Sequence, residues 1–543
     1  MNQKKLKDPL YGYITIPTEI MREVVDTATF QRLRRIMQTS YSPLFASAVH
    51  NRFVHSLGVY HLGSIVVSVL EREISNNVTP EILEELDIPL DRLKHVFLLS
   101  CLLHDVGHAP FSHTGETFYL ENRQSYDGLH KTIIEIVGTE DFKNDVPIEK
   151  SKAAAPHEIM SAIIGIQEFQ KLLQTPEEKD FFARCITGYG YKDAVGIKSI
   201  FNCYIQMLNS KVIDVDKLDY LIRDAYITGY CTVNIDYERL LTALTIIEEN
   251  GKYKLAYYKG AISVIEDVVY AHDSERKWIQ NHPVILYENY LLQHIMELLE
   301  QKLSCDEKKL FSAESLGVSG QIFKDGLAIR LLSDDDIIHL AKQCYENKFV
   351  SEYFERDLRR HPLWKSEAEY KAFFLDRVSG GDVIDLLEDA MEAATKYLSK
   401  STTNWVINLD LLHLLKKELS DLEATTLDQK SKEAQRNEKQ KILRVVTCLY
   451  QYSESCGYQG DFVLLKSSQF NSGFSKPDFS TTKIVFPIVS TNKISNFGDK
   501  VSSLMGISSS RDNFFYLYYK CGDNTVPALN VNELCSRLIK EFV

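Results

Sequence analysis

The stretch LKHVFLLSCLLHDVGHAPFSH, residues 93–113, begins as an apolar segment and ends in a group of imidazoles. The apolar spacing predicts a helix over 94–105 that is buried on nearly all sides. This helix would carry His104 and Asp105 at its C-terminal end. Neighbouring helical residues point about 100° apart. The two side chains can therefore converge on one ion only at the helix end or at a turn, which Gly107 permits.

A carboxylate beside an imidazole in an apolar wall suggests a divalent cation, because an unpaired buried charge is costly. Two more ligands must come from other segments. His55 is one candidate, in HNRFVHSLGV, where a helix is expected to begin near His55. The other lies in VIDVDKLDYLIRDAY, and spacing alone does not choose among its four aspartates, which are Asp214, Asp216, Asp219 and Asp224. The alternative interpretation is that His104 and Asp105 form a buried pair that fixes a helix end.

The composition is that of a globular protein. The chain has 543 residues, of which 44% are hydrophobic and 25% charged, so two or three packed units are expected. A net charge of −13 argues against general affinity for nucleic acids or membranes. The ten cysteines form no CxxC pair, and the N-terminus does not look like a secretory signal. These features predict reduced thiols and a cytoplasmic location, without membrane association.

Helical periodicity dominates the chain, and the sequence shows no internal repeat. The fold class predicted is mainly α, with a helical body and a smaller C-terminal α+β unit. A short hairpin is predicted over 252–264, strands over 483–494 and 514–521, and a solvated helix or connector over 427–444. Single helices are predicted over 19–38, 56–74, 94–105, 157–174, 211–227 and 284–303. The predicted domains are 1–300 (catalytic), 301–410 (helical extension) and 411–543 (C-terminal α+β region).

Three blocks occur in a fixed order along the chain: HNRFVHSLGV at 50–59, LLHDVGHAPFSH at 102–113 and DVDKLDYLIRD at 214–224. Together with KDPLYGYITIP and DTATFQRLRRIMQ upstream, they resemble the HD phosphohydrolase superfamily. More narrowly, they are similar to the deoxynucleoside triphosphate (dNTP) triphosphohydrolases, which include bacterial dGTPases and the animal SAM-and-HD-domain enzymes. The resemblance extends over roughly residues 5–290.

The resemblance implies a metal site and a phosphate-facing group. The implied ligands are His55, His104, Asp105 and Asp216, holding one divalent or transition ion (Fe, Mn, Zn, Ni or Mg), with Mg on the triphosphate as an addition. The implied catalytic residues are His108, His113, His157 and Glu116. Each of these three histidines has a plainer alternative, as a packed core residue or a helix cap.

Further residues are implied to bind substrate. Arg52 and Lys217 match phosphate-contacting positions, and Arg suits bidentate binding. Asp216, Tyr220 and Asp224 are spaced to share one helix face, and the resemblance places Tyr220 and Asp224 at the sugar, together with Gln38. The stretches after Gln38 and around 270–284 depart from the family pattern, which leaves base preference open.

A regulatory site is also implied. Asp26, Gln31 and Arg34 match residues that bind a guanine nucleotide between subunits in the animal enzymes, with Lys4 as an added phosphate contact. GTP or dGTP would then be the effector, and a homo-oligomer (dimer or tetramer) is expected. The alternative is that Asp26 only caps a helix and that Arg34 pairs with a nearby carboxylate.

The function predicted is metal-dependent hydrolysis of dNTPs to deoxynucleoside and tripolyphosphate. One alternative is another HD phosphohydrolase activity, on a nucleoside monophosphate, a cyclic nucleotide or an alarmone. The other is a nucleotide sensor or a single-stranded nucleic-acid-binding protein, for which the basic stretch FERDLRRHPLWK (354–365) is the one supporting feature.

Overall fold

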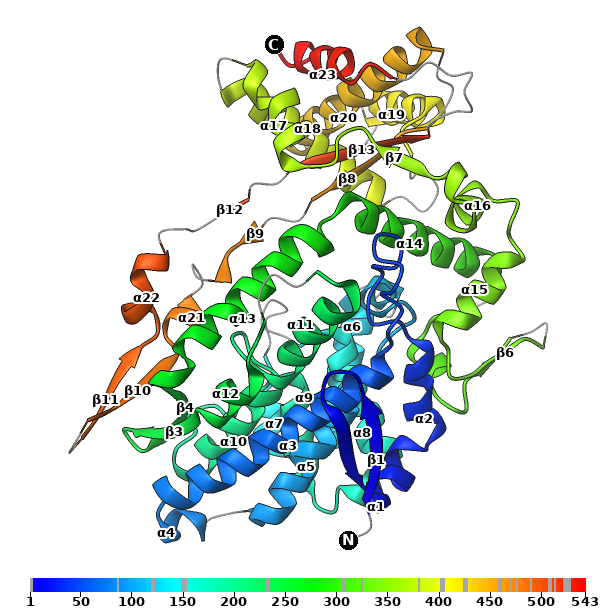
Figure 1. Cartoon of the computed structure of the whole chain (residues 1–543). Coiled ribbons are helices and arrows are strands. Elements are labelled where there is room, and N and C mark those ends of the chain that lie inside the picture. The colour runs from blue at the N-terminus through cyan, green and yellow to red at the C-terminus, as the bar shows by residue number, and fades with distance from the viewer. Residues whose placement is uncertain are drawn as a thin grey trace. The chain divides into compact units, whose positions relative to one another are not determined.

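A computed structural model gives the fold (Figure 1). It describes residues 3–84, 87–118, 123–147, 154–230, 234–303, 309–323, 326–378, 381–400, 406–422, 428–457, 461–467, 470–473, 477–488, 491–505, 510–511, 514–520 and 529–543. Among these residues there are 23 α-helices and 13 mostly short strands, which confirms the prediction of a mainly α chain with small sheets.

The chain forms two compact units, each assembled from several segments. The first unit comprises 1–276, 298–343 and 471–509, and the second comprises 277–297, 344–470 and 510–543. The division into 1–300, 301–410 and 411–543 stays a prediction.

The first unit holds all residues predicted for the site. Its strands are β1 (Gln3–Asp8), β2 (Gly12–Pro17), β3 (Leu244–Glu249), β4 (Lys252–Tyr258), β5 (Gln321–Ile322), β6 (Ala328–Ile329), β10 (Lys483–Ile488) and β11 (Thr491–Asn496). Its helices are α1 (Thr18–Ile20), α2 (Ala28–Gln31), α3 (Arg52–Asn77), α4 (Pro80–Leu83), α5 (Leu90–Leu103), α6 (Arg123–Val137), α7 (Glu140–Asp145), α8 (Pro156–Glu168), α9 (Pro176–Thr187), α10 (Gly196–Leu208), α11 (Val215–Thr228), α12 (Tyr237–Thr242), α13 (Ile262–Ser274), α15 (Asp334–Lys342), α21 (Pro477–Ser480) and α22 (Gly498–Met505).

The second unit begins with α14 (Pro283–Leu303), whose last residues belong to the first unit. Its other helices are α16 (Lys348–Phe354), α17 (Glu367–Phe373), α18 (Gly381–Lys400), α19 (Leu409–Leu422), α20 (Gln429–Ser455) and α23 (Val531–Lys540). Its strands are β7 (Arg360–Pro362), β8 (Val463–Lys466), β12 (Ser510–Arg511) and β13 (Phe515–Lys520), with β13 between β7 and β8. The short strand β9 (Phe470–Asn471) has its first residue in this unit and its second in the first unit. The basic stretch 354–365 is partly used internally here, since buried Arg360 pairs with Glu352.

Two predicted elements need correction. The hairpin is β3–β4, with a turn at Asn250 and Gly251, because both adopt the positive φ that a tight hairpin turn requires. Residues after Tyr258 are helical rather than part of it. The single helix predicted over 19–38 is interrupted, because Thr27 caps a new helix by accepting a hydrogen bond from the Phe30 amide.

Helix α3 is the central element of the first unit and packs against α5, α11 and β3. It begins at Arg52, earlier than predicted, because the Asn51 side chain caps it. It is long and apolar enough to cross a membrane, with a mean hydropathy of 1.6 over its best window, but 72% of that window is buried inside the fold. Its apolar character is therefore explained by its place in the protein core.

Gly58 allows the close approach of α11 to α3. A Cβ atom at this position would lie 1.8 Å from Asp219 Oδ1 and 2.5 Å from Arg223 Nη2. These charged groups cannot move apart without breaking their own pairing, so only glycine fits.

We expect Gly58→Ala to destabilise the fold, although alanine is the better helix former. Forced contacts in a packed interior typically cost about 1–3 kcal/mol. The urea midpoint of unfolding measures the effect. Gly128→Ala in α6 is the matched control, because nothing lies within 4 Å of its added Cβ. That control should be neutral or stabilising, and equal midpoints for both variants would contradict the close-packing argument.

Candidate active site

Four predicted ligands from three helices converge. His55 extends from α3, His104 and Asp105 follow α5, and Asp216 lies in the first turn of α11. His55 Nε2 lies 2.9 Å from Asp216 Oδ1 and 3.3 Å from His104 Nε2. Asp105 places one oxygen 3.4 Å from His104 Nε2 and the other 3.6 Å from His55 Nε2. The structure therefore brings together all four residues of the predicted metal site.

Both imidazoles have their second nitrogen occupied. His104 Nδ1 is 2.9 Å from the carbonyl oxygen of Cys101, and His55 Nδ1 is 2.7 Å from Asp219 Oδ2. With Nδ1 as the donor, each Nε2 would be available to bind a metal ion that the carboxylates also hold. Two imidazole nitrogens and two carboxylates at this spacing fit a divalent cation. Four protein ligands leave coordination positions on such an ion open for water and substrate, which a catalytic metal site requires.

Asp219 supports this group from behind. It is fully buried and accepts both nitrogens of an Arg223 fork at 2.9 Å and the Tyr11 hydroxyl at 2.8 Å. Burial opposes its ionisation, but Arg223 and His55 outweigh burial and lower the pKa of Asp219 to about 2. The carboxylate thus stays charged and fixes the tautomer of His55.

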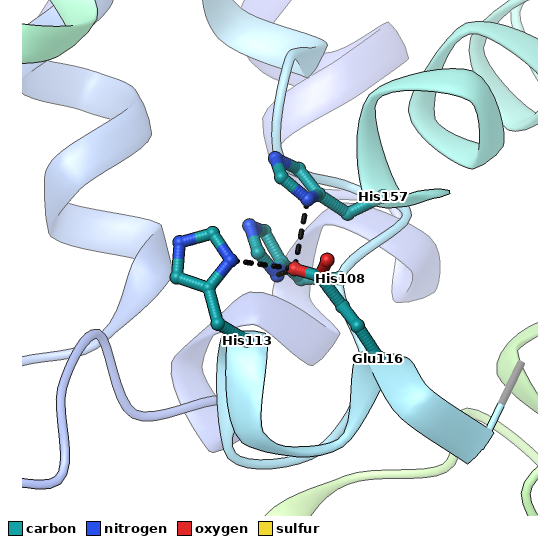
Figure 2. Close-up of side chains that lie close together, drawn as sticks. All are labelled: His108, His113, Glu116 and His157. Carbon is teal, nitrogen blue, oxygen red and sulfur yellow. Dashed lines mark hydrogen bonds and ion pairs between the residues drawn. The ribbon is translucent and has the colours of Figure 1, made fainter. Parts of the chain in front are cut away.

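Figure 2 shows a second group, which consists of His108, His113, Glu116 and His157. Glu116 Oε1 lies 2.7 Å from His113 Nδ1 and 2.8 Å from His157 Nδ1. The rings of His108 and His157 stack with centroids 3.9 Å apart. His108 Nε2 is 3.3 Å from Asp105 Oδ1, so Asp105 touches both groups. His108, His113, Glu116 and His157 are spaced closely enough to hold an ion themselves, but their charges indicate a different use.

The residues of this second group have divergent pKa values. Burial would lower the pKa of His157, but Glu116 raises it to about 9. Burial would raise the pKa of Glu116, but His157 and His113 hold it well below its usual range. Burial, Arg52 and His157 push the pKa of His108 well below its usual range. At neutral pH, His157 is therefore a cation and His108 is neutral, which suits binding of an anion such as phosphate.

The histidine loop, residues 106–112, joins Asp105 of the ligand group to His113 of the second group and has an unusual backbone. Phe111 and Ser112 both lie in the left-handed region, with φ of 56° and 55°, which costs of order 1–3 kcal/mol for each non-glycine residue. The chain turns over 104–107, as predicted, and Gly107 lies in this turn without adopting the left-handed conformation. Glycine is needed at this position because a Cβ there would lie 2.4 Å from the backbone nitrogen of Ser161.

The predicted phosphate-binding cations already have internal partners. Arg52 is buried and donates to Asp105 Oδ2 at 2.7 Å and to Ser112 Oγ at 2.9 Å. Lys217 pairs with Asp214 and donates to the carbonyl oxygen of Ser210. Arg52 therefore lies beside the ligand group and links it to the histidine loop.

The predicted sugar-side residues lie on α11 and in the segment before α3. Asp224 is buried and its Oδ1 lies 2.7 Å from His50 Nε2. Tyr220 is half-buried, and burial together with nearby Glu275 raises the pKa of its hydroxyl well above its usual value. The backbone N–H of Gln38 donates to the carbonyl oxygen of His50 at 3.0 Å. The side-chain Oε1 of Gln38 is buried without a partner among the described residues.

The predicted regulatory residues form close contacts at the surface. Lys4 Nζ lies 3.9 Å from Asp26 Oδ2, and Arg34 Nε donates to Gln31 Oε1 at 2.8 Å. The Arg34 guanidinium lies 3.5 Å from the centre of the Phe53 ring. The helix cap is Thr27, so the alternative of Asp26 as the N-cap is wrong. Arg34 pairs with an amide rather than with the carboxylate that the alternative required.

Sequence reasoning missed two residues that the structure places at the site. Asp219 was one of four candidate aspartates, but nothing showed that it supports His55 from behind. Its spacing was the available signal, since Asp219 lies three residues after Asp216 and four before Arg223 on one helix. His50, the partner of Asp224, precedes the Asn51 cap and had no distinguishing spacing.

No protein-family model matches the chain. The uncharacterized protein MG461 of Mycoplasma genitalium is 28% identical over 271 residues, which cover 49% of this chain and 53% of that protein. The deoxynucleoside triphosphate triphosphohydrolase SAMHD1 of Gallus gallus is 29% identical over 290 residues, covering 52% of this chain and 43% of that protein. The chain thus spans about half the length of these curated relatives or less.

Among solved structures, a phosphohydrolase from Bacteroides thetaiotaomicron superposes with a TM-score of 0.52 at 17% identity, covering 96% of this chain and all of that one. This likeness shows a shared fold. The sequence relatives confirm the resemblance indicated by the motifs: over about half its length, this chain is similar to the HD-type deoxynucleoside triphosphate triphosphohydrolases.

Proposed function

We propose that this protein is a metal-dependent HD phosphohydrolase that cleaves dNTPs to deoxynucleoside and tripolyphosphate. The observation that carries the proposal is the position of Asp105. One oxygen faces His104 and His108, and the other faces His55 and Arg52. A metal-ligand group and a phosphate-binding group thus share one carboxylate.

A bound divalent ion would lower the pKa of water and neutralise charge at the phosphate under attack. The chain's own residues supply the remaining functions. Cationic His157 stabilises negative charge on the phosphate. His113, oriented through Nδ1 by Glu116, leaves Nε2 to give a proton to the deoxynucleoside oxygen as the bond to the α-phosphorus breaks.

The other predicted contacts complete the proposed substrate site. Arg52 and Lys217 bind the phosphates, and Gln38, Tyr220 and Asp224 bind the sugar. Asp224 accepts from the 3′-hydroxyl, with His50 holding the carboxylate in place through their 2.7 Å contact. A cytoplasmic location, where dNTPs occur, is part of the proposal.

The first test is product analysis on a nucleotide panel with added divalent metals. We expect tripolyphosphate from dNTPs, whereas orthophosphate or an opened cyclic nucleotide would favour another HD activity.

Asp105→Asn should abolish turnover and weaken metal retention, because it removes a charge from both groups. Asp193→Asn, at an exposed residue of the turn between α9 and α10, is the control. Parental dNTP hydrolysis by Asp105→Asn would contradict the assignment.

The second prediction concerns pH. Since the pKa of His157 is about 9, its charge is present at neutral pH and lost as pH rises through 9. We expect KM for dNTPs to rise above that pH, and the stability from the Glu116 pair, complete below about pH 6.5, to be lost over the same upper range.

His157→Gln should raise KM at neutral pH and remove the dependence near pH 9. His339→Gln, on an exposed helix face, serves as the control and should keep the wild-type profile. A wild-type pH–KM curve that is flat from pH 7 to 10 would show that His157 does not bind the phosphate.

We further propose that a guanine nucleotide, GTP or dGTP, regulates the enzyme by binding at Lys4, Asp26, Gln31 and Arg34 and promoting a homo-oligomer. The contacts of Lys4 with Asp26 and of Arg34 with Gln31 support this proposal, because they gather two cations with groups able to read guanine. SAMHD1 relatives at 27–29% identity support it by resemblance.

Arg34→Ala should abolish activation by GTP or dGTP and the accompanying increase in size, while metal content stays unchanged. Size-exclusion chromatography and turnover of a second dNTP, with and without effector, measure both effects. Arg35→Ala, an exposed neighbour paired with Asp335, should behave as wild type. If the effector changes neither quantity in wild-type protein, these residues only pack the helix.

A further inference from the structure

The catalytic histidine loop is held from behind by a helix more than 200 residues downstream in the chain. We propose that Asp334 and Arg32 are positioning residues that hold the loop 106–112, and through it His108 and His113, in the geometry for catalysis. The catalytic part of this inference rests on the proposed phosphohydrolase function.

Asp334 joins two separate loops with one carboxylate. It is the first residue of α15 and is 5% exposed. Its Oδ1 accepts the Phe111 amide at 2.7 Å, and its Oδ2 accepts the Met37 amide at 2.8 Å. Both oxygens are thus engaged by backbone N–H groups, which are otherwise costly to bury unpaired.

Arg32 completes the attachment from the other side. It is 4% exposed, and its Nε donates to the carbonyl oxygen of Leu332, just before α15. Its Nη2 donates to the carbonyl oxygen of His108 at 2.7 Å, and its Nη1 to that of Val106 at 3.3 Å. One planar fork therefore ties the downstream segment to the loop between the two groups of the site.

These attachments lead directly to the reacting groups. Phe111 and Ser112 are held in the left-handed region, which needs support from outside the loop. The Ser112 hydroxyl donates to the carbonyl oxygen of Met37 at 2.5 Å and accepts from Arg52 Nε. Arg52 in turn binds Asp105. A shift of Phe111 would therefore displace Ser112, Arg52 and the following His113 together.

The pKa of Asp334 reflects the exclusion of water from its contacts with the Phe111 and Met37 amides. Burial raises the pKa of Asp334 to about 7, although the Met37 and Phe111 amides and Arg32 oppose the rise. Asparagine has almost the same shape, but its NH₂ group would face one of the two N–H donors. Asp334→Asn therefore removes one attachment with little change in packing.

The test compares Asp334→Asn with Asp335→Asn, whose carboxylate is 65% exposed on the same helical turn. For Asp334→Asn, peptide-resolved hydrogen exchange should accelerate at 36–38 and 106–114 and stay unchanged over α3 and α11. Metal content should remain at the wild-type level. With dNTP as substrate, kcat should fall about 10- to 100-fold with little change in KM, as expected for misplaced catalytic groups.

Asp335→Asn should match the wild type in all three measurements. If Asp334→Asn fails to fold, Arg32→Lys is measured instead. Lysine cannot reach three carbonyl oxygens at once, so this variant should show the same local acceleration of hydrogen exchange. Unchanged exchange at 106–114, or equal acceleration throughout the first unit, would overturn the proposal. If hydrogen exchange accelerates only at 36–38 and 106–114 but the wild-type protein hydrolyses no dNTP, Asp334 and Arg32 still hold the loop. That result would refute the proposed function instead.

Discussion

The structure depends on a buried carboxylate, that of Asp219. Removing it from water is unfavourable unless its charge is matched and its lone pairs are filled. Arg223 supplies the charge, and Tyr11 and His55 fill the remaining positions. The approach of α11 that permits this is only possible beside Gly58. The residue that orients His55, a predicted metal ligand, thus also joins α3, α11 and the N-terminal hairpin.

The two groups of the site have complementary electrostatics. The ligand group is rich in carboxylates, and Arg52 holds the pKa of Asp105 well below its usual range although burial opposes this. The second group carries the His157 cation beside neutral His108. One side therefore carries negative charge and the other a cation. A divalent ion held by the carboxylates and the His157 cation would both present positive charge to a phosphate lying between them.

Much of the site was predictable from the sequence. His104, Asp105, His113 and Glu116 lie within a short segment, so local spacing was informative. Their distant partners His55, Asp216 and His157 followed from a resemblance in the order of blocks, because spacing within each block left alternatives open. The hairpin at Asn250 was misplaced by several residues, since the first strand, β3, alternates weakly and follows directly on a helix.

The sequence by itself determined the mainly helical class, the buried α5 that leads into two predicted ligands, and the candidate set of imidazoles. These depend on periodicity and on short-range chemistry, which a linear chain displays. Only the tertiary structure decided that Asp219 rather than Asp216 supports His55 from behind, that His50 holds Asp224, and that Asp334 and Arg32 secure the histidine loop. The partners in these contacts are up to 300 residues apart, and a buried charge takes its partner from whatever element the fold brings beside it, which spacing along the chain does not reveal.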